Sequence, residues 1–162
     1  MMISPASMAL LMRVLLASTP LAERPEGLTG LFDSGAMDKR GVVTLSIFER
    51  ITRGSRNALE VLQVIGMRSA NRVGLWVELE NLGDTPWTPR ALVVLEIGGE
   101  DLEALVWPPE PIPPGGRSSV FIEAKASDKQ AMGTYVLKLS EDGPRAVTLG
   151  NITFPRFKDR QG

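Results

Sequence analysis

Carboxylates are the main side chains left for catalysis or metal binding, because the chain contains no histidine and no cysteine. Without these two residue types there is no imidazole base, no thiolate nucleophile, no disulfide and no histidine- or thiolate-ligated metal. The acids that we considered are Glu78, Glu80, Glu100, Asp101, Glu103 and Glu110. They are spread over expected strand faces and turns, and none stands in a calcium-loop pattern. The sequence therefore predicts no catalytic residue, no metal site and no cofactor.

Composition and charge indicate an ordinary globular domain. Hydrophobic residues make up 43% of the chain, and the 18 basic and 19 acidic residues leave a net charge of −1. Because the charges are balanced and no long block of either sign occurs, the chain would attract nucleic-acid phosphates only weakly, so nucleic-acid binding is disfavoured. A chain of 162 residues fits one domain with a modest extension, since domains most often have about 100–150 residues.

Residues 72–80 form the clearest element, an alternating strand that ends in a run of turn formers. Its period of two is typical of a strand with one side in a core. The expected inward residues are Val73, Leu75, Val77 and Leu79. The turn formers that follow are Asn81, Gly83, Asp84 and Pro86.

Similar strands recur from residue 58 onward at a spacing of about ten residues, which is typical of sandwiches and barrels. The expected strands are residues 59–67, 72–80, 91–97, 102–107, 118–125, 134–140 and 145–149, with a last pairing at 152–154. A tight hairpin is expected at Gly98-Gly99, and one helical turn is expected at 127–132. The proline-rich segment around Ile112 is expected to run along a sheet edge or to cross between the sheets. This pattern predicts a mainly β fold, an immunoglobulin-like or fibronectin-like antiparallel β-sandwich of about seven strands over residues 57–155.

Residues 1–56 predict short helices instead. In residues 1–26 an apolar run, 8–16, is too short to span a bilayer, which takes about 20 apolar residues. It has two interpretations: an export signal, or a helix packed on the domain, which we favour because Arg13 interrupts the run. The first places the protein in the periplasm or cell envelope, and the second in the cytoplasm. The pattern of residues 27–56 predicts a helix at 28–32 that stops at Gly35, a turn near 37–40 and then a connector. Residues 156–162 are expected to form a charged tail that frays.

Three aromatic residues form the candidate interaction surface: Trp76, Phe121 and Trp107. Trp76 and Phe121 lie on the polar side of alternating strands, where an exposed apolar patch usually marks a contact. The alternative, which we favour, is that the apolar helix at 8–16 covers them, since that helix also needs a partner surface. Trp107 and Trp87, each beside a proline, are expected to plug the ends of the core.

Several fragments of the sequence resemble those of a known protein family. They are GLTGLFDSGAMDKRGV (27–42), NALEV (57–61), PWT (86–88), WPPEPIPPG (107–115) and GTYVLKLSEDGPRAVTLGNITFP (133–155). In these fragments, and in the same order, the chain resembles the carboxy-terminal half of a paralogous family of unknown function that is expanded in myxobacteria. Longer members carry an export signal and an additional amino-terminal β-rich region, so the chain is either a shortened paralogue or begins further upstream. The resemblance implies no catalytic residue, cofactor or substrate.

The function expected from the sequence is a non-enzymatic β-sandwich module that acts through contacts with a protein partner or with itself. Its location is the cell envelope if the apolar run is an export signal or the chain begins further upstream. The alternative is a small-ligand or carbohydrate-binding module that uses Trp76, Phe121 or Trp107. A hydrolase that works with carboxylates alone is the third candidate.

Overall fold

A computed structural model describes residues 25–54, 59–95, 101–141 and 145–159, with the backbone alone at 91–95. The chain divides into two compact units, Met1–Gly35 and Ala36–Gly162. The described part of the first unit contains α2 (Gly27–Asp33), the helix predicted at 28–32. The helix ends at Asp33, and Gly35, two residues on, has a φ of 76°, the left-handed conformation that glycine supplies after helix ends. None of the helices in the described ranges is long and apolar enough to cross a membrane.

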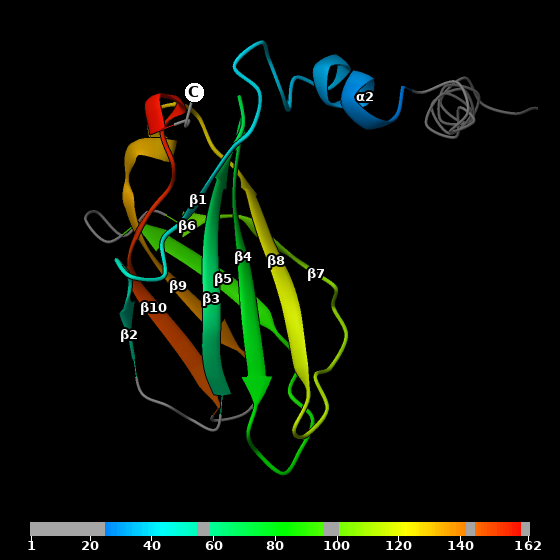
Figure 1. The fold of residues 1–162 in the computed structure, drawn as a ribbon, viewed down its shortest axis with the longest axis vertical. Helices are drawn as coiled ribbons and strands as arrows, with labels where there is room; N and C mark the ends of the chain where they lie inside the picture. Colours follow the sequence, from blue (N-terminus) through cyan, green and yellow to red (C-terminus); the bar gives the residue numbers. More distant parts are fainter. Residues whose placement is uncertain (1–24, 55–58, 96–100, 142–144, 160–162) are drawn as a thin grey trace, which may run out of the picture. The chain divides into compact units, whose positions relative to one another are not determined.

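The second unit is a sandwich of two antiparallel sheets, in which β3, β4 and β8 lie across β5, β9 and β10 (Figure 1). The first sheet has the order β1 (Val43–Ser46), β3 (Leu59–Arg68), β4 (Arg72–Asn81), β8 (Arg117–Lys125) and β7 (Ala104–Trp107). The second has the order β2 (Thr52–Arg53), β10 (Ala146–Thr153), β9 (Thr134–Ser140), β5 (Arg90–Leu95) and β6 (Asp101–Leu102). The predicted β-sandwich is therefore confirmed.

The strand order is that of an immunoglobulin-like domain. Without β1 and the two-residue strands, β3-β4-β8-β7 faces β10-β9-β5, which corresponds to the order ABED against GFC. The hydroxyl of Tyr135, at the start of β9, donates to the backbone oxygen of Gln130 at 2.8 Å, as in the tyrosine corner of these folds. Leu137, two residues on, is fully buried at the position where an antibody domain carries a disulfide cysteine.

The core lies between the inward faces of the two sheets and contains the predicted inward residues of β4. Val77 and Leu137 are both 0% exposed, whereas Glu78, next to Val77, lies half-buried on the opposite face. The helical turn predicted at 127–132 is the short 3-10 helix η2 (Gln130–Met132), and the Ser127 hydroxyl accepts the N–H of its first residue, Gln130, at 3.1 Å.

Replacing Val77 by alanine is expected to lower the free energy of unfolding by about 2–4 kcal/mol, because a buried aliphatic side chain leaves a cavity. Glu78→Ala, its neighbour on the outer face, is the matched control and is expected to change it by only about 0.5 kcal/mol. Denaturant unfolding of the two variants measures both effects. A larger loss for Glu78→Ala would mean that the two faces of β4 are reversed.

The sandwich begins earlier than expected, because β1 and β2 come from the segment that the sequence reading assigned to a connector. β1 pairs with β3 and β2 with β10, while Ile47 and Ile51 lie in the core. The compact unit starts at Ala36, so the boundary expected at residue 57 is wrong. Strands of two to four residues carry too little alternation to be recognised without their partners.

Two expected strands also have different limits. Residues 102–107 are not one strand: Leu102 belongs to the second sheet and Ala104–Trp107 to the first, with the chain crossing at Glu103. The expected strand at 145–149 and the pairing at 152–154 are one strand, β10, with an irregularity where Asn151 has a φ of 55°. The hairpin expected at residues 98–99 and the apolar run at 8–16 lie outside the described residues.

One end of the sandwich is closed around Trp87, which is 0% exposed, so the prediction that it plugs the core is confirmed. Its backbone exchanges two hydrogen bonds with Ile112, of 3.0 and 2.7 Å. Beside it lies Asn81, also 0% exposed, whose amide donates to the backbone oxygens of Thr85 and Ile112 at 2.9 Å. Arg145 completes the cluster, because its guanidinium donates to Thr85 and its backbone oxygen accepts the indole N–H of Trp87.

Residues 157–159 of the carboxy-terminal segment form a short 3-10 helix, so the fraying expected of the tail is wrong for these residues. The ring of Phe157, in the 3-10 helix η3 (Phe157–Asp159), lies 4.1 Å from the guanidinium of Arg40 and 4.7 Å from that of Arg68. Arg68 is buried and pairs with Asp128 at 2.7 Å. Hydrogen bonds from Arg40 hold the pKa of the Asp38 carboxyl below its usual value.

Candidate functional site

The register of the first sheet brings the three candidate residues into one row on its outer face. Trp76 of β4 lies opposite Phe121 of β8, and Phe121 lies opposite Trp107 of β7. On the other side of Trp76, Ile65 of β3 extends the row. Neighbouring strands are about 4.8 Å apart, so side chains in such a row touch one another.

These aromatic side chains are progressively more exposed toward the edge of the sheet. Trp76 is half-buried, Phe121 is 43% exposed and Trp107 is 68% exposed. The rings of Trp76 and Phe121 stack with centroids 6.4 Å apart and an angle of 21° between their planes. The prediction that Trp107 plugs the core is wrong, because its side chain lies on the outer face of an edge strand.

A second row of outward residues widens the apolar surface. Leu105 of β7, 70% exposed, lies two residues before Trp107, and Met67 of β3 lies two residues after Ile65. In the register, Gly74 of β4 and Glu123 of β8 lie between these two residues, so one charged side chain interrupts the second row. Gly74 leaves room for Met67, whose terminal methyl would be only 3.3 Å from a Cβ at that glycine. We call the set the outer apolar patch: Ile65, Met67, Trp76, Leu105, Trp107 and Phe121.

Sequence reasoning found half of the outer apolar patch and missed the rest. Ile65 and Met67 alternate with the inward residues of β3, so period two alone marks them as outward. Leu105 shares a face with Trp107, two residues on, and was missed because Trp107 was expected to plug the end of the core. All six residues can be recognised as one patch only from the register of the strand pairs, and that requires knowledge of which strands pair.

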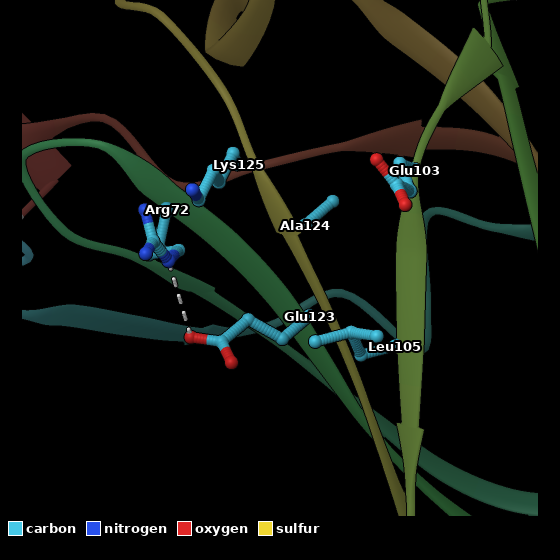
Figure 2. Close-up of a pocket in the computed structure, with 6 residues that line it drawn as sticks. All are labelled: Arg72, Glu103, Leu105, Glu123, Ala124 and Lys125. Carbon is cyan, nitrogen blue, oxygen red and sulfur yellow. Dashed lines mark ion pairs between the residues drawn. The ribbon is translucent and has the colours of Figure 1, made fainter. Parts of the chain in front are cut away.

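A hollow of about 310 Å³ lies beside the patch and carries charges of both signs (Figure 2). Its lining residues are Arg72, Glu103, Leu105, Glu123, Ala124 and Lys125. Arg72 from β4 reaches toward Glu123 from β8, with its Nε 3.9 Å from the carboxylate, and Glu103 lies across the hollow on the β7 side (Figure 2). The hollow offers hydrogen-bond donors and acceptors to a polar ligand or to the rim of a partner.

The acids considered from the sequence do not converge. Glu80 lies 3.6 Å from Arg117, while Asp101, Glu103 and Glu110 are exposed and Glu100 lies outside the described residues. Within the described ranges, no group of three or more acidic side chains is placed to hold a metal ion. What this surface offers is therefore contact area and polar contacts around it.

Fold and surface together define an immunoglobulin-like β-sandwich with an aromatic patch on the outer face of its larger sheet. Comparisons with protein-family models, with curated proteins and with solved structures found no match to this chain. The resemblance to a myxobacterial family therefore stays a prediction.

Proposed function

We propose that this protein is a non-enzymatic β-sandwich module of the cell envelope that acts through protein–protein contacts made by the outer apolar patch. The observation that carries the proposal is the continuous row from Ile65 to Trp107, in which Phe121 is 43% and Trp107 68% exposed, with Leu105, 70% exposed, beside it on β7. Exposed apolar patches rimmed by polar residues mark interaction sites, and aromatic residues are enriched in protein interfaces.

The shape of this surface favours a protein over a small ligand. Small-molecule sites are concave and bury most of the ligand against apolar walls. Here the apolar residues lie across the outer face of four neighbouring strands, and the hollow beside them is lined mainly by charged side chains. An apolar centre with Arg72, Glu123 and Lys125 at its border matches the usual interface, which has an apolar core and a polar rim.

Photo-cross-linking in cells tests the proposal. A photoreactive amino acid in place of Phe121 is expected to give a discrete protein adduct in the envelope fraction, because that side chain lies in the centre of the patch. The matched control is the same amino acid in place of Lys138, an exposed residue of β9 in the other sheet. The mass of the adduct separates a second copy of the chain from a different protein. Equal labelling from both positions, or none from 121, would refute the proposal.

The alternative function is binding of a carbohydrate or another small ligand. It is favoured by the stacked rings of Trp76 and Phe121, which lie close to the charged hollow. Sugars that stack on these rings should change tryptophan fluorescence in a saturable way. A titration with oligosaccharides, repeated on Trp107→Ala, distinguishes this function from the first.

We also propose that the chain belongs to the myxobacterial family that it resembles. The support is the number of shared fragments and their common order along the chain. An in-frame upstream sequence that encodes an export signal and a further β-rich region would support membership and the cell envelope as the location.

A further inference from the structure

The two sheets have four edge strands, and three of them carry features that hinder pairing with another chain. β2 and β6 are only two residues long, and each carries an exposed charge, Arg53 or Asp101. β1 presents polar Thr44 and Ser46 on its outer face. Short edge strands and charged residues are devices by which proteins prevent additional strands from joining a sheet.

β7 lacks the exposed charge of β2 and β6 and the polar outer face of β1. Its four residues, Ala104–Trp107, include no charge, proline or glycine, and the two outward side chains, Leu105 and Trp107, are 70% and 68% exposed. Among the residues that the structure describes, β7 pairs with β8 alone, so its other side presents unpaired backbone N–H and C=O groups. An apolar strand in this state is a template for another strand.

We propose that a second copy of the chain adds to β7, with the two β7 strands antiparallel about a twofold axis through Val106. This inference rests on the proposed function and names one partner for the same surface. In this register Leu105 of one copy lies opposite Trp107 of the other, so the two outer apolar patches join into one. A slip by one residue would place outward side chains against inward ones, which disfavours it.

The chemistry of β7 suits its own copy. Twofold pairing of a charged strand brings like charges close together, and like charges directly opposite each other destabilise a sheet. β7 is uncharged and the net charge of the chain is −1, so neither local nor overall repulsion opposes association. Pro108 follows directly and has no N–H, which limits the pairing to a short segment. We therefore expect a dimer that dissociates on dilution.

Disulfide trapping tests the register, because the chain has no cysteine of its own. Directly opposed residues of antiparallel strands have Cα atoms about 4.5–5.5 Å apart, within the range that a disulfide spans. Val106→Cys should therefore give a covalent dimer on mild oxidation. The matched control, Leu45→Cys, places a cysteine at a half-buried position of β1, the opposite edge of the same sheet. A mixture of Leu105→Cys and Trp107→Cys proteins should form mixed disulfides in preference to either homodimer.

Sedimentation of the full chain over a range of concentrations tests, without a cross-link, whether β7 forms the dimer interface. Leu105→Lys should weaken dimerisation about tenfold or more, because it places an unpaired charge in the interface. Thr44→Lys, which places the same charge on the outer face of β1 at the opposite edge of the sheet, should leave dimerisation unchanged. Both side chains are exposed, so circular dichroism should be unaltered in both variants.

Two results would overturn this inference and leave the proposed function standing. One is self-association that Phe121→Ser abolishes and Leu105→Lys does not, which would mean that the copies meet through the face of the sheet. The other is a chain that stays monomeric, with Val106→Cys trapped no more than Leu45→Cys, while position 121 still cross-links to a different protein. The proposed function fails separately if position 121 gives no adduct at all.

Discussion

The free energy of unfolding is expected to fall by about 3–5 kcal/mol when Trp87 is replaced by alanine. This side chain is 0% exposed, so its loss opens a cavity at the end of the core. It also leaves the backbone oxygen of Arg145 without the indole N–H that it accepts at 3.3 Å. Denaturant unfolding followed by circular dichroism measures the change.

Trp107→Ala provides the control for Trp87→Ala, because it removes the same side chain from an exposed position. Its expected effect is about 0.5 kcal/mol or less, the usual range for surface substitutions. The two tryptophans look alike in the sequence, since each stands beside a proline. Equal losses of stability would mean that Trp107 is buried in solution, by a partner copy or otherwise.

A second large loss, about 2–4 kcal/mol, is expected for Asn81→Ala. The Asn81 amide is buried and serves four partners: its nitrogen donates to Thr85 and Ile112, and its oxygen accepts from Gly83 and Arg145. Truncation removes these bonds together, and a buried polar group that loses its partner costs about 1–3 kcal/mol. Thermal or denaturant unfolding measures the loss. A change below 1 kcal/mol would show that water replaces the amide.

A double-mutant cycle with Arg145→Ala separates the contribution of Asn81 from that of the cluster. Arg145 donates to Asn81 at 3.4 Å, and both side chains donate to the backbone oxygen of Thr85. Residues that share a network usually couple by about 0.5–3 kcal/mol, so the two losses should not add. Strict additivity would mean that the two side chains stabilise the turn independently.

Period-two alternation predicted the long strands well because it is a local property. In β4 and β8 the inward residues are those that the sequence marks, and Val77 and Val120 are buried as expected. The fold class followed from the number and spacing of such strands. Trp76 and Phe121 were placed on the outer face for the same reason.

The remaining features depend on which strands pair, and no local pattern contains that information. β1 and β2 are strands only because β3 and β10 lie beside them. Ile65 and Leu105 join the outer apolar patch through the register of three separate strand pairs. Trp107 was misplaced because the prolines beside it suggested the end of the core, whereas the chain there follows the edge of a sheet.

The strand order has a consequence for how fast the protein reaches its native state. β3 with β4, and β9 with β10, are hairpins, but the pairings of β4 with β8 and of β5 with β9 join distant parts of the chain, as Trp76 and Phe121 show. Domains dominated by such non-local pairs refold in about milliseconds to seconds, much more slowly than helical bundles. During this interval the paired edges of β4 and β8 are still open. Refolding yield should therefore rise on dilution, because open strand edges on separate chains then meet less often.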